Sequence, residues 1–335
     1  MNRVSRACGL ALALLVLIAS PAAADAPGPT DYLSEVVSVD PPTDVVSLQI
    51  LGGDSFLELV VAEGHAVDVI GYRGERYLRF EADGTVLENQ NSPSKYLNEE
   101  RYGTDTGPDT AVPEAAPDWK AVATGGSFAW HDHRTHWMND QKPANARPGD
   151  IILESVVPLI VDGAEVDVTV VSVLQARPSP TGVVLGVAVA AGIALALARE
   201  LLPGHSAALL AGASAAALVF GTWAFVSVPG GTGPSLLLWL MPALALSFAL
   251  GGWAKADEFL GHGALLLGGG VLAGWGWLRR GALVAAIIPS HAPDTLDRAV
   301  VAAALVGGAI AAGAGLLGVV RVLAHTAPTP ATGSS

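Results

Sequence analysis

The chain has 335 residues, of which 51% are hydrophobic and 15% charged, and it carries a formal net charge of −13. This acidity argues against a nucleic-acid partner, because such partners bind basic surfaces. The single cysteine, Cys8, lies near the N-terminus ahead of an apolar run. Beyond that leader, disulfides, thiolate metal ligands and cysteine nucleophiles are excluded.

Residues 1–24 have the pattern of a secretory signal peptide. Arg3 and Arg6 give a positive start, Leu10–Ile18 form a short apolar core, and Ala22–Ala24 form a small-residue cleavage site. The apolar core is shorter than the roughly 20 residues of a membrane span. We therefore expect an exported protein whose mature chain begins at Asp25.

Residues 25–178 are predicted to form an exported, all-β domain. This region holds most of the acidic residues, and its hydrophobic residues alternate with a period of two between glycine-containing turns. The pattern predicts an antiparallel sandwich, either of the Greek-key, cupredoxin-like kind or of the immunoglobulin-like kind. The expected strands are Val46–Ile50, Phe56–Val61, Val67–Val69, Tyr77–Phe80, Val86–Leu87, the histidine-rich stretch after Gly126, Ile151–Ile160 and Val166–Val173.

A long polar segment, Asn89–Gly125, separates two of these strands. Loops of such length are usually functional or disordered. Tyr96 and Tyr102 indicate that part of it packs back on the sheet. The segment is therefore also a candidate contact surface for a protein partner in the cell envelope.

Residues 179–325 are rich in Ala, Gly, Leu and Val and are predicted to form a transmembrane bundle of about five helices. With the N-terminal domain outside, five spans leave residues 326–335 as a disordered cytoplasmic tail of a multi-pass plasma-membrane protein. Arg199, Lys255 and Arg321 then face inward, in agreement with the positive-inside rule. Each expected span is near the length that crosses the bilayer: 183–198, 207–228, 236–252, 265–288 and 300–323.

Two arginines interrupt the fourth expected span, so four or six spans are alternatives to five. Charges within a bilayer are costly and are usually paired or functional. Arg279 and Arg280 have candidate partners in Asp294 and Asp297, and we expect structural ion pairs. A transporter-like bundle that uses these four residues is a third, weaker functional hypothesis.

One short stretch concentrates the reactive side chains of the chain. Three of the eight histidines, His131, His133 and His136, fall within six residues and are followed by Met138. On a strand His131 and His133 would lie on one face, roughly 6.5–7 Å apart, and a bulge or turn near Arg134 would bring in His136 and Met138. We predict a metal site with these four ligands, supported by Trp130, Asp132, Arg134 and Trp137.

The donor set limits the choice of metal. Three imidazoles with a thioether suit copper, and three imidazoles with a water molecule suit zinc. Copper is therefore the first expected cofactor and zinc the second. In the alternative interpretation no metal binds: the tryptophans belong to the core, the histidines bond to the long loop, and Asp132 and Arg134 form a structural ion pair.

The run from Gly126 to His133 resembles the His-x-His strand of multicopper oxidases and their cupredoxin domains, in which the histidine pair ligates copper. The match covers Gly126, Ser127, Phe128, His131 and His133. The chain has no further His-x-His motif and no cysteine ligand, so a trinuclear centre, a blue-copper site and oxidase activity are not implied.

The whole chain also resembles a group of actinobacterial exported membrane proteins that share a signal peptide, a β domain and a membrane bundle. The resemblance implies this architecture and supplies no activity. Its marks are Gly71-Tyr72, Tyr77-Leu78-Arg79, Asn91-Ser92-Pro93, Tyr96-Leu97-Asn98, the Trp130–Met138 motif, Arg279-Arg280, Pro289 and Leu296-Asp297-Arg298.

No sequence pattern of an enzyme stands out. The chain lacks Gly-x-Ser-x-Gly, a Walker loop and His-Glu-x-x-His. We therefore expect no catalysis, and a membrane-anchored protein that handles or senses a transition metal outside the cell. The competing hypothesis is a structural or interaction protein of the cell envelope.

Overall fold

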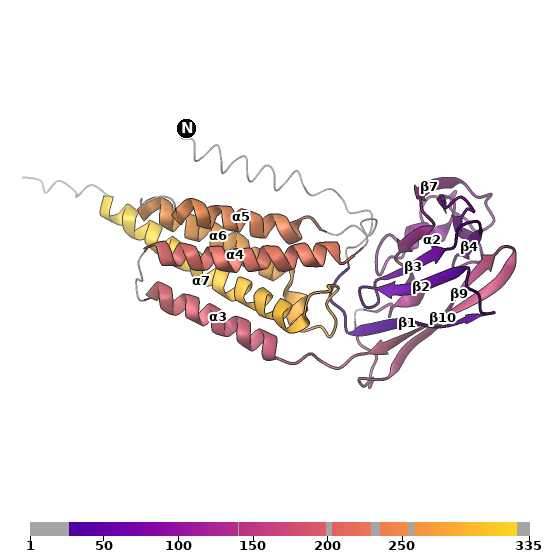
Figure 1. Cartoon of the computed structure of the whole chain (residues 1–335), viewed down its shortest axis with the longest axis horizontal. Helices are drawn as coiled ribbons and strands as arrows, with labels where there is room; N and C mark the ends of the chain where they lie inside the picture. Colours follow the sequence, from indigo (N-terminus) through magenta and orange to yellow (C-terminus); the bar gives the residue numbers. More distant parts are fainter. Residues whose placement is uncertain (1–26, 140, 199–202, 229–234, 254–257, 327–335) are drawn as a thin grey trace, which may run out of the picture. The chain divides into compact units, whose positions relative to one another are not determined.

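The computed structural model describes residues 27–139, 141–198, 203–228, 235–253 and 258–326. The expected signal peptide, residues 1–24, and all of the expected tail except Thr326 lie outside these ranges. The chain forms two compact units (Figure 1): the first comprises the residues up to Ala176 and the stretch Val228–Leu236, and the second comprises Arg177–Ser227 and the residues from Leu237 onward. Each unit is described by itself.

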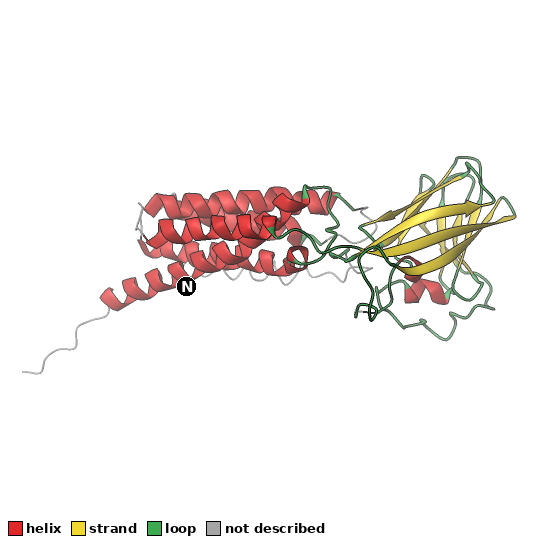
Figure 2. Ribbon diagram, turned by 90° about the horizontal axis from the view of Figure 1, so that it is seen from below, coloured by secondary structure: helices red, strands yellow, loops and turns green. Residues whose placement is uncertain are grey.

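The first unit consists of ten strands in two antiparallel sheets (Figure 2). The larger sheet has seven strands in the order β1-β10-β9-β4-β5-β6-β7, and the smaller has three in the order β2-β3-β8. The strands are β1 (Tyr32–Asp40), β2 (Val46–Leu51), β3 (Phe56–Val61), β4 (Val67–Ile70), β5 (Arg76–Phe80), β6 (Val86–Asn89), β7 (Trp119–Ala123), β8 (Ser127–Trp130), β9 (Ile151–Val161) and β10 (Ala164–Leu174).

The two sheets share one hydrophobic core. Leu57 and Leu59 of β3 pack in the same cluster as Val157 and Leu159 of β9, and Trp130 at the end of β8 joins them. Strand residues two apart point to the same face, so the alternating pattern buries one side of each strand. The predicted two-sheet antiparallel domain is confirmed, whereas a cupredoxin-like or immunoglobulin-like topology stays a prediction.

Seven of the eight expected strands are present, and the eighth, the histidine-rich stretch, is a strand only as far as Trp130. Two further strands, β1 and β7, were not predicted. In β1 the buried position Ser34 is polar, so the alternation is masked; its hydroxyl donates to the backbone oxygen of Thr135. In β7 the three central residues are exposed, which hides the strand from a hydrophobicity pattern.

The long polar segment after β6 is ordered where the structure describes it. It contains the short helix α2 (Pro93–Leu97), which Ser92 caps, and then strand β7. Glu75 fixes the start of α2 by accepting hydrogen bonds from the hydroxyls of Ser92 and Ser94, at 2.7 and 2.6 Å. The prediction that part of this segment packs on the sheet is confirmed.

The second unit is a bundle of apolar helices: α3 (Thr181–Ala198), α4 (Pro203–Val226), α5 (Leu237–Trp253), α6 (Glu258–Leu278) and α7 (Asp294–Thr326). Within the described residues, four helices are long and apolar enough to cross a membrane, and α5 is a shorter apolar helix. The fourth expected span, 265–288, extends too far at its C-terminal end. Helix α6 ends at Leu278, and a 3-10 turn, η3 (Arg280–Leu283), follows it.

Glycines let α6 and α7 approach closely. A Cβ atom added at Gly308 of α7 would lie 2.6 Å from the backbone nitrogen of Ala273, and one added at Gly269 of α6 would lie 2.6 Å from that of Ala312. Small residues at such contacts allow backbones to pack directly, which is a common basis of helix association in membranes.

Candidate metal centre

The three histidines are brought together by a turn at the end of a strand. Strand β8 ends at Trp130, so His131 is the first residue beyond it, and the 3-10 turn η1 covers His133–Thr135. The side chain of Asp132 caps this turn by accepting from the backbone nitrogen of Arg134 at 3.0 Å. The turn near Arg134 was predicted. The backbone of Asp132, between His131 and His133, is extended, and the ring centroids of these two histidines are 5.7 Å apart.

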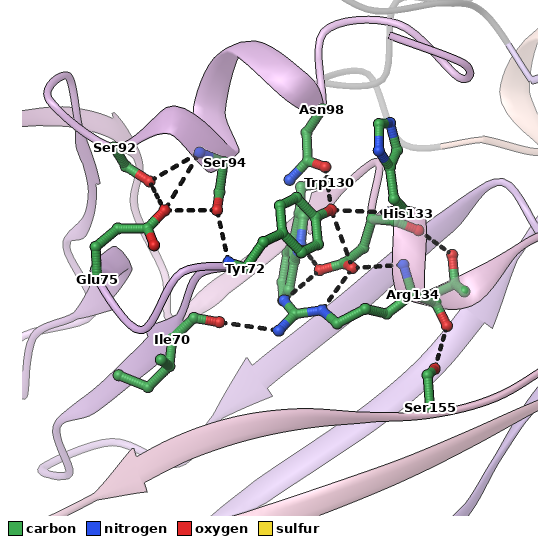
Figure 3. A network of polar contacts seen from close by, with 12 residues as sticks. Ile70, Tyr72, Glu75, Ser92, Ser94, Asn98, Trp130, His133, Arg134 and Ser155 are labelled. Atoms are coloured by element: carbon green, nitrogen blue, oxygen red, sulfur yellow. Dashed lines mark hydrogen bonds and ion pairs between the residues drawn. The ribbon is translucent and has the colours of Figure 1, made fainter. Parts of the chain in front are cut away.

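Neighbouring strands hold the turn in place. The hydroxyl of Ser34 in β1 donates to the backbone oxygen of Thr135. The hydroxyl of Ser155 in β9 donates to the backbone oxygen of Arg134 (Figure 3). Thr135 is fully buried and donates to the backbone oxygen of Asp132 at 2.7 Å. The turn is therefore anchored to two strands of the larger sheet, β1 and β9, which lie on either side of β10.

The imidazole rings of His131, His133 and His136 form one compact cluster that could hold a metal ion. One ring nitrogen of each histidine lies within 4.8 Å of those of the other two. The ring centroids of His131 and His136 are 4.7 Å apart. His136 is fully buried and His131 is 5% exposed, while His133 is partly exposed.

The hydrogen bonds of the two buried rings determine which nitrogens carry protons. His131 Nδ1 lies 2.8 Å from the backbone oxygen of Ser55, and His136 Nδ1 lies 3.2 Å from that of Trp137. A carbonyl oxygen only accepts, so both Nδ1 atoms donate, and the lone pair of each neutral ring is then on Nε2.

The two Nε2 atoms of His131 and His136 are only 2.9 Å apart. In two neutral rings with protons on Nδ1, two lone pairs face each other at this distance and repel. A cation or a shared proton between them removes the repulsion. Backbone acceptors on the outer nitrogens, with lone pairs converging inward, are the arrangement of metal-binding histidines.

Both buried histidines are neutral at physiological pH. Burial lowers the pKa of His131 to about 4, and the positive charge of Arg101 and the neighbouring His133 add to the effect. Burial also lowers the pKa of His136 to about 3, together with His131 and Arg101. Neutral imidazole is the form that binds metal ions.

His133 lies on the side of the cluster that contacts the long polar segment. Its Nε2 atom lies 3.1 Å from the backbone oxygen of Glu100, so this nitrogen donates and Nδ1 carries the lone pair. Its ring stacks on Tyr72 with a centroid distance of 5.8 Å. The third ring is thus fixed by Glu100 and Tyr72, neither of which was predicted as part of the site.

Asp132 and Arg134 form a buried ion pair beneath the histidines (Figure 3). Asp132 accepts from Arg134 Nη2 at 2.8 Å, from the indole nitrogen of Trp130 at 2.9 Å and from the hydroxyl of Tyr72 at 3.2 Å. Burial alone would raise the pKa of Asp132, but Arg134 lowers it to about 2. The carboxylate is ionised and its oxygens are engaged, so it supports the turn and is not a metal ligand.

Asp54 and Arg101 form a second ion pair next to the cluster, which sequence reasoning missed. Arg101 Nη2 donates to Asp54 Oδ2 at 2.6 Å, and the side chain of Asp54 is fully buried. The ring of Tyr102 contacts His136 edge-on, with centroids 6.0 Å apart. The only feature of the sequence that pointed to this region was Tyr102, which indicated that the long segment packs on the sheet.

Trp137 and Met138 lie at the outer side of the motif. Trp137 supplies the backbone oxygen that accepts from His136, and its indole nitrogen donates to the backbone oxygen of Gln141 at 2.9 Å. Met138 is 42% exposed. Its role as a thioether ligand stays a prediction.

The predicted charges in the bundle are only partly arranged as expected. Arg279 and Asp297 form a buried two-pronged ion pair at 2.7 and 2.9 Å. Arg280 is instead exposed and donates to the backbone oxygen of Trp277 at 2.9 Å. The carboxylate of Asp294 lies 3.6 Å from the guanidinium of Arg298, which was not predicted as an ion-pair partner.

Arg298 explains why the chain after α6 can leave the helical conformation. Its buried guanidinium donates to the backbone oxygens of Ala282, Ala285 and Ala286. Non-helical backbone among apolar helices is stable only where other groups satisfy its oxygens. The charges of Arg279, Asp294, Asp297 and Arg298 therefore have structural roles, which argues against a substrate site there.

Comparisons of the chain with models of known protein families, with curated proteins and with solved structures found no match.

Proposed function

We propose that the protein binds a transition-metal ion, copper first and zinc second, at His131, His133 and His136. The observation that carries the proposal is the pair of buried Nε2 lone pairs, 2.9 Å apart, whose rings are fixed by backbone acceptors. Such a pair is stable when a cation lies against both nitrogens. His133, whose ring lies within the same cluster, supplies a third donor.

The spacing of the two nitrogens favours copper. With metal–nitrogen bonds of about 2.0–2.1 Å, two nitrogens are about 2.9 Å apart when the bonds meet at a right angle and about 3.4 Å apart at a tetrahedral angle. Right-angled, tetragonal geometry is typical of Cu(II), and tetrahedral geometry is typical of zinc. The local resemblance to the His-x-His strand of cupredoxin domains points the same way.

The role that follows is metal handling or sensing at the outer face of the plasma membrane. Support comes from the signal-like N-terminus and from the apolar helices that follow the β domain. In this proposal the helices anchor the protein in the bilayer, and the β domain presents the site outside the cell without catalysing a reaction.

A second candidate is a non-catalytic envelope protein in which the histidine turn is structural. The observation that favours it is the Asp132–Arg134 network, which fixes the turn without any metal. In that case the polar segment Asn89–Gly125 would contact a protein partner.

The experiment that separates the two candidates is a titration of the full-length protein in detergent with Cu(II), Cu(I) and Zn(II). We expect one equivalent to bind, with the resonances of His131 and His136 shifted. His131→Ala with His136→Ala should abolish binding while the β domain keeps its fold, judged by circular dichroism.

The matched control is His65→Ala, because His65 is exposed and pairs with Asp162 at 2.6 Å in a turn of the same domain. It should bind metal as the wild type does. If no ion binds, or if the double variant only lowers the melting temperature of a protein that never bound metal, the structural candidate replaces the metal site.

A further inference from the structure

We propose that the metal held by His131, His133 and His136 takes a further ligand from solution, and that this ligand is a small anion bound beside Arg101. The inference rests on the proposed metal site and specifies what completes it. The anion would be of the size of hydroxide, bicarbonate, chloride or azide, bound directly to the metal.

The number of protein donors leaves a coordination position open. Among the described residues, the cluster contains three histidines and no carboxylate. Copper(II) and zinc bind at least four ligands, and sites with three protein ligands keep a position for water or another exogenous ligand. If Met138 binds as a weak, long axial ligand, the position for the exogenous ligand stays open.

The charge of the site favours an anion over a neutral ligand. The three imidazoles are neutral donors, so a divalent ion keeps two positive charges in a largely buried pocket. Uncompensated charge is expensive to bury. Asp132 is already paired with Arg134. Asp54 pairs with Arg101 through Oδ2 and does not belong to the group of candidate ligands, so, among the residues that the structure describes, the site contains no carboxylate that binds the metal.

Arg101 adds positive potential on the same side of the cluster. It lies in the chain between Glu100, whose backbone oxygen contacts His133, and Tyr102, whose ring contacts His136. Arg101 is held by Asp54 at 2.6 Å and lies against Tyr102, with 5.6 Å between the guanidinium carbon and the ring centroid. A guanidinium placed in this way attracts an anion to the metal's open position.

The same side of the cluster is the one that solvent reaches. His131 and His136 are buried, whereas His133 is partly exposed and Tyr102 is 45% exposed. The segment Glu100–Tyr102 contacts both His133 and His136. A small anion can therefore approach past Tyr102, while a large ligand would have to displace this segment.

The test uses the full-length protein in detergent, loaded with one equivalent of Cu(II) and titrated with azide. We expect a new azide-to-copper absorption band and a changed electron paramagnetic resonance spectrum that saturate at one azide per copper. Bicarbonate and chloride should compete with azide at this position.

Variants at the ion pair test the role of Arg101. Arg101→Gln combined with Asp54→Asn replaces the ion pair by a neutral hydrogen-bonded pair. We expect it to bind copper with the same stoichiometry and azide about tenfold more weakly, because the attraction of the Arg101 charge is lost and the simultaneous loss of the Asp54 charge offsets only part of it. Arg101→Lys, which keeps the charge, should remain close to the wild type, as should Arg73→Gln, an exposed control in the same domain.

Two results would overturn the inference while leaving the metal site intact. One is copper binding with no spectral response to azide, which would show that the protein fills every accessible position. The other is unchanged azide affinity in the double variant, which would remove Arg101 from the site. Failure of copper itself to bind would instead overturn the metal site, and this inference with it.

Discussion

The chemistry of the site is decided by which atoms of single residues are already engaged. Asp132 lies between two of the clustered histidines in the sequence, yet its oxygens are engaged by Arg134, Trp130 and Tyr72. The histidines use one nitrogen each to bond a backbone oxygen, which directs the other nitrogen inward. Along this short stretch, the ionised Asp132 thus supports the turn, and the neutral histidines on either side of it supply the candidate ligands.

The supporting role of Asp132 predicts a large, metal-independent loss of stability for Asp132→Asn. The change leaves Arg134 buried without its partner, which costs about 3–5 kcal/mol. Thermal unfolding of the metal-free protein, followed by near-ultraviolet circular dichroism, measures this loss. Glu99→Gln, which breaks the exposed pair with Lys95, is the control and should cost less than about 1 kcal/mol. Equal melting temperatures for the two variants would contradict the buried ion pair.

The lowered pKa values of His131 and His136 predict that the metal-free protein loses stability as the pH falls from about 6.5 toward 4. In the unfolded chain both histidines take up protons near pH 6.5, whereas in the folded protein they stay neutral until about pH 4 and 3. The unfolded state therefore binds more protons in this window, and unfolding becomes easier by up to about 1.4 kcal/mol per histidine and pH unit.

The measurement for this prediction is the difference in denaturant midpoint between the wild type and His131→Gln with His136→Gln at several pH values. The wild type should lose more stability on acidification than the variant. A wild type that gains stability on acidification would show that one proton is shared between the two Nε2 atoms.

At the scale of the element, the sequence predicts strands that follow a regular hydrophobic pattern, and it does not predict contacts between residues that are far apart in the chain. The alternating pattern predicted most of the strands, because most of their buried residues are apolar, whereas the buried polar Ser34 hid β1. The three histidines were found from their density alone. Arg101 and Asp54 are 47 residues apart and carry no motif, so only the folded chain brings them together.

The packing of α6 against α7 predicts different effects for two glycines of one helix. Gly308→Ala should lower the melting temperature in detergent, because the new Cβ would lie 2.6 Å from the backbone nitrogen of Ala273 and force the helices apart. Gly313→Ala is the matched control: nothing lies within 4 Å of its added Cβ, and alanine favours the helix. Equal melting temperatures for the two variants would show that α6 and α7 do not pack directly.

At the scale of the whole molecule, the function depends on which side of the membrane each unit occupies, and this depends on whether α5 crosses. Four other helices are long enough to span, and α5 is shorter, Leu237–Gly252. Five crossings place the β domain and the end of α7 on opposite sides, whereas four place them on the same side. The proposed extracellular metal site requires the β domain to be outside in either case.

Single introduced cysteines can decide the topology, because Cys8 is the only natural cysteine and lies within the expected signal peptide. Glu165→Cys marks an exposed position at the start of β10, and His325→Cys marks the exposed end of α7. A membrane-impermeant maleimide applied to intact cells should label the first variant at once and the second only after permeabilisation. The variants carry Cys8→Ser as well, so that any uncleaved leader stays silent. Labelling of both positions in intact cells would mean that α5 does not cross. Protection of Glu165→Cys would place the histidine cluster inside the cell, where it could not handle metal ions at the outer face.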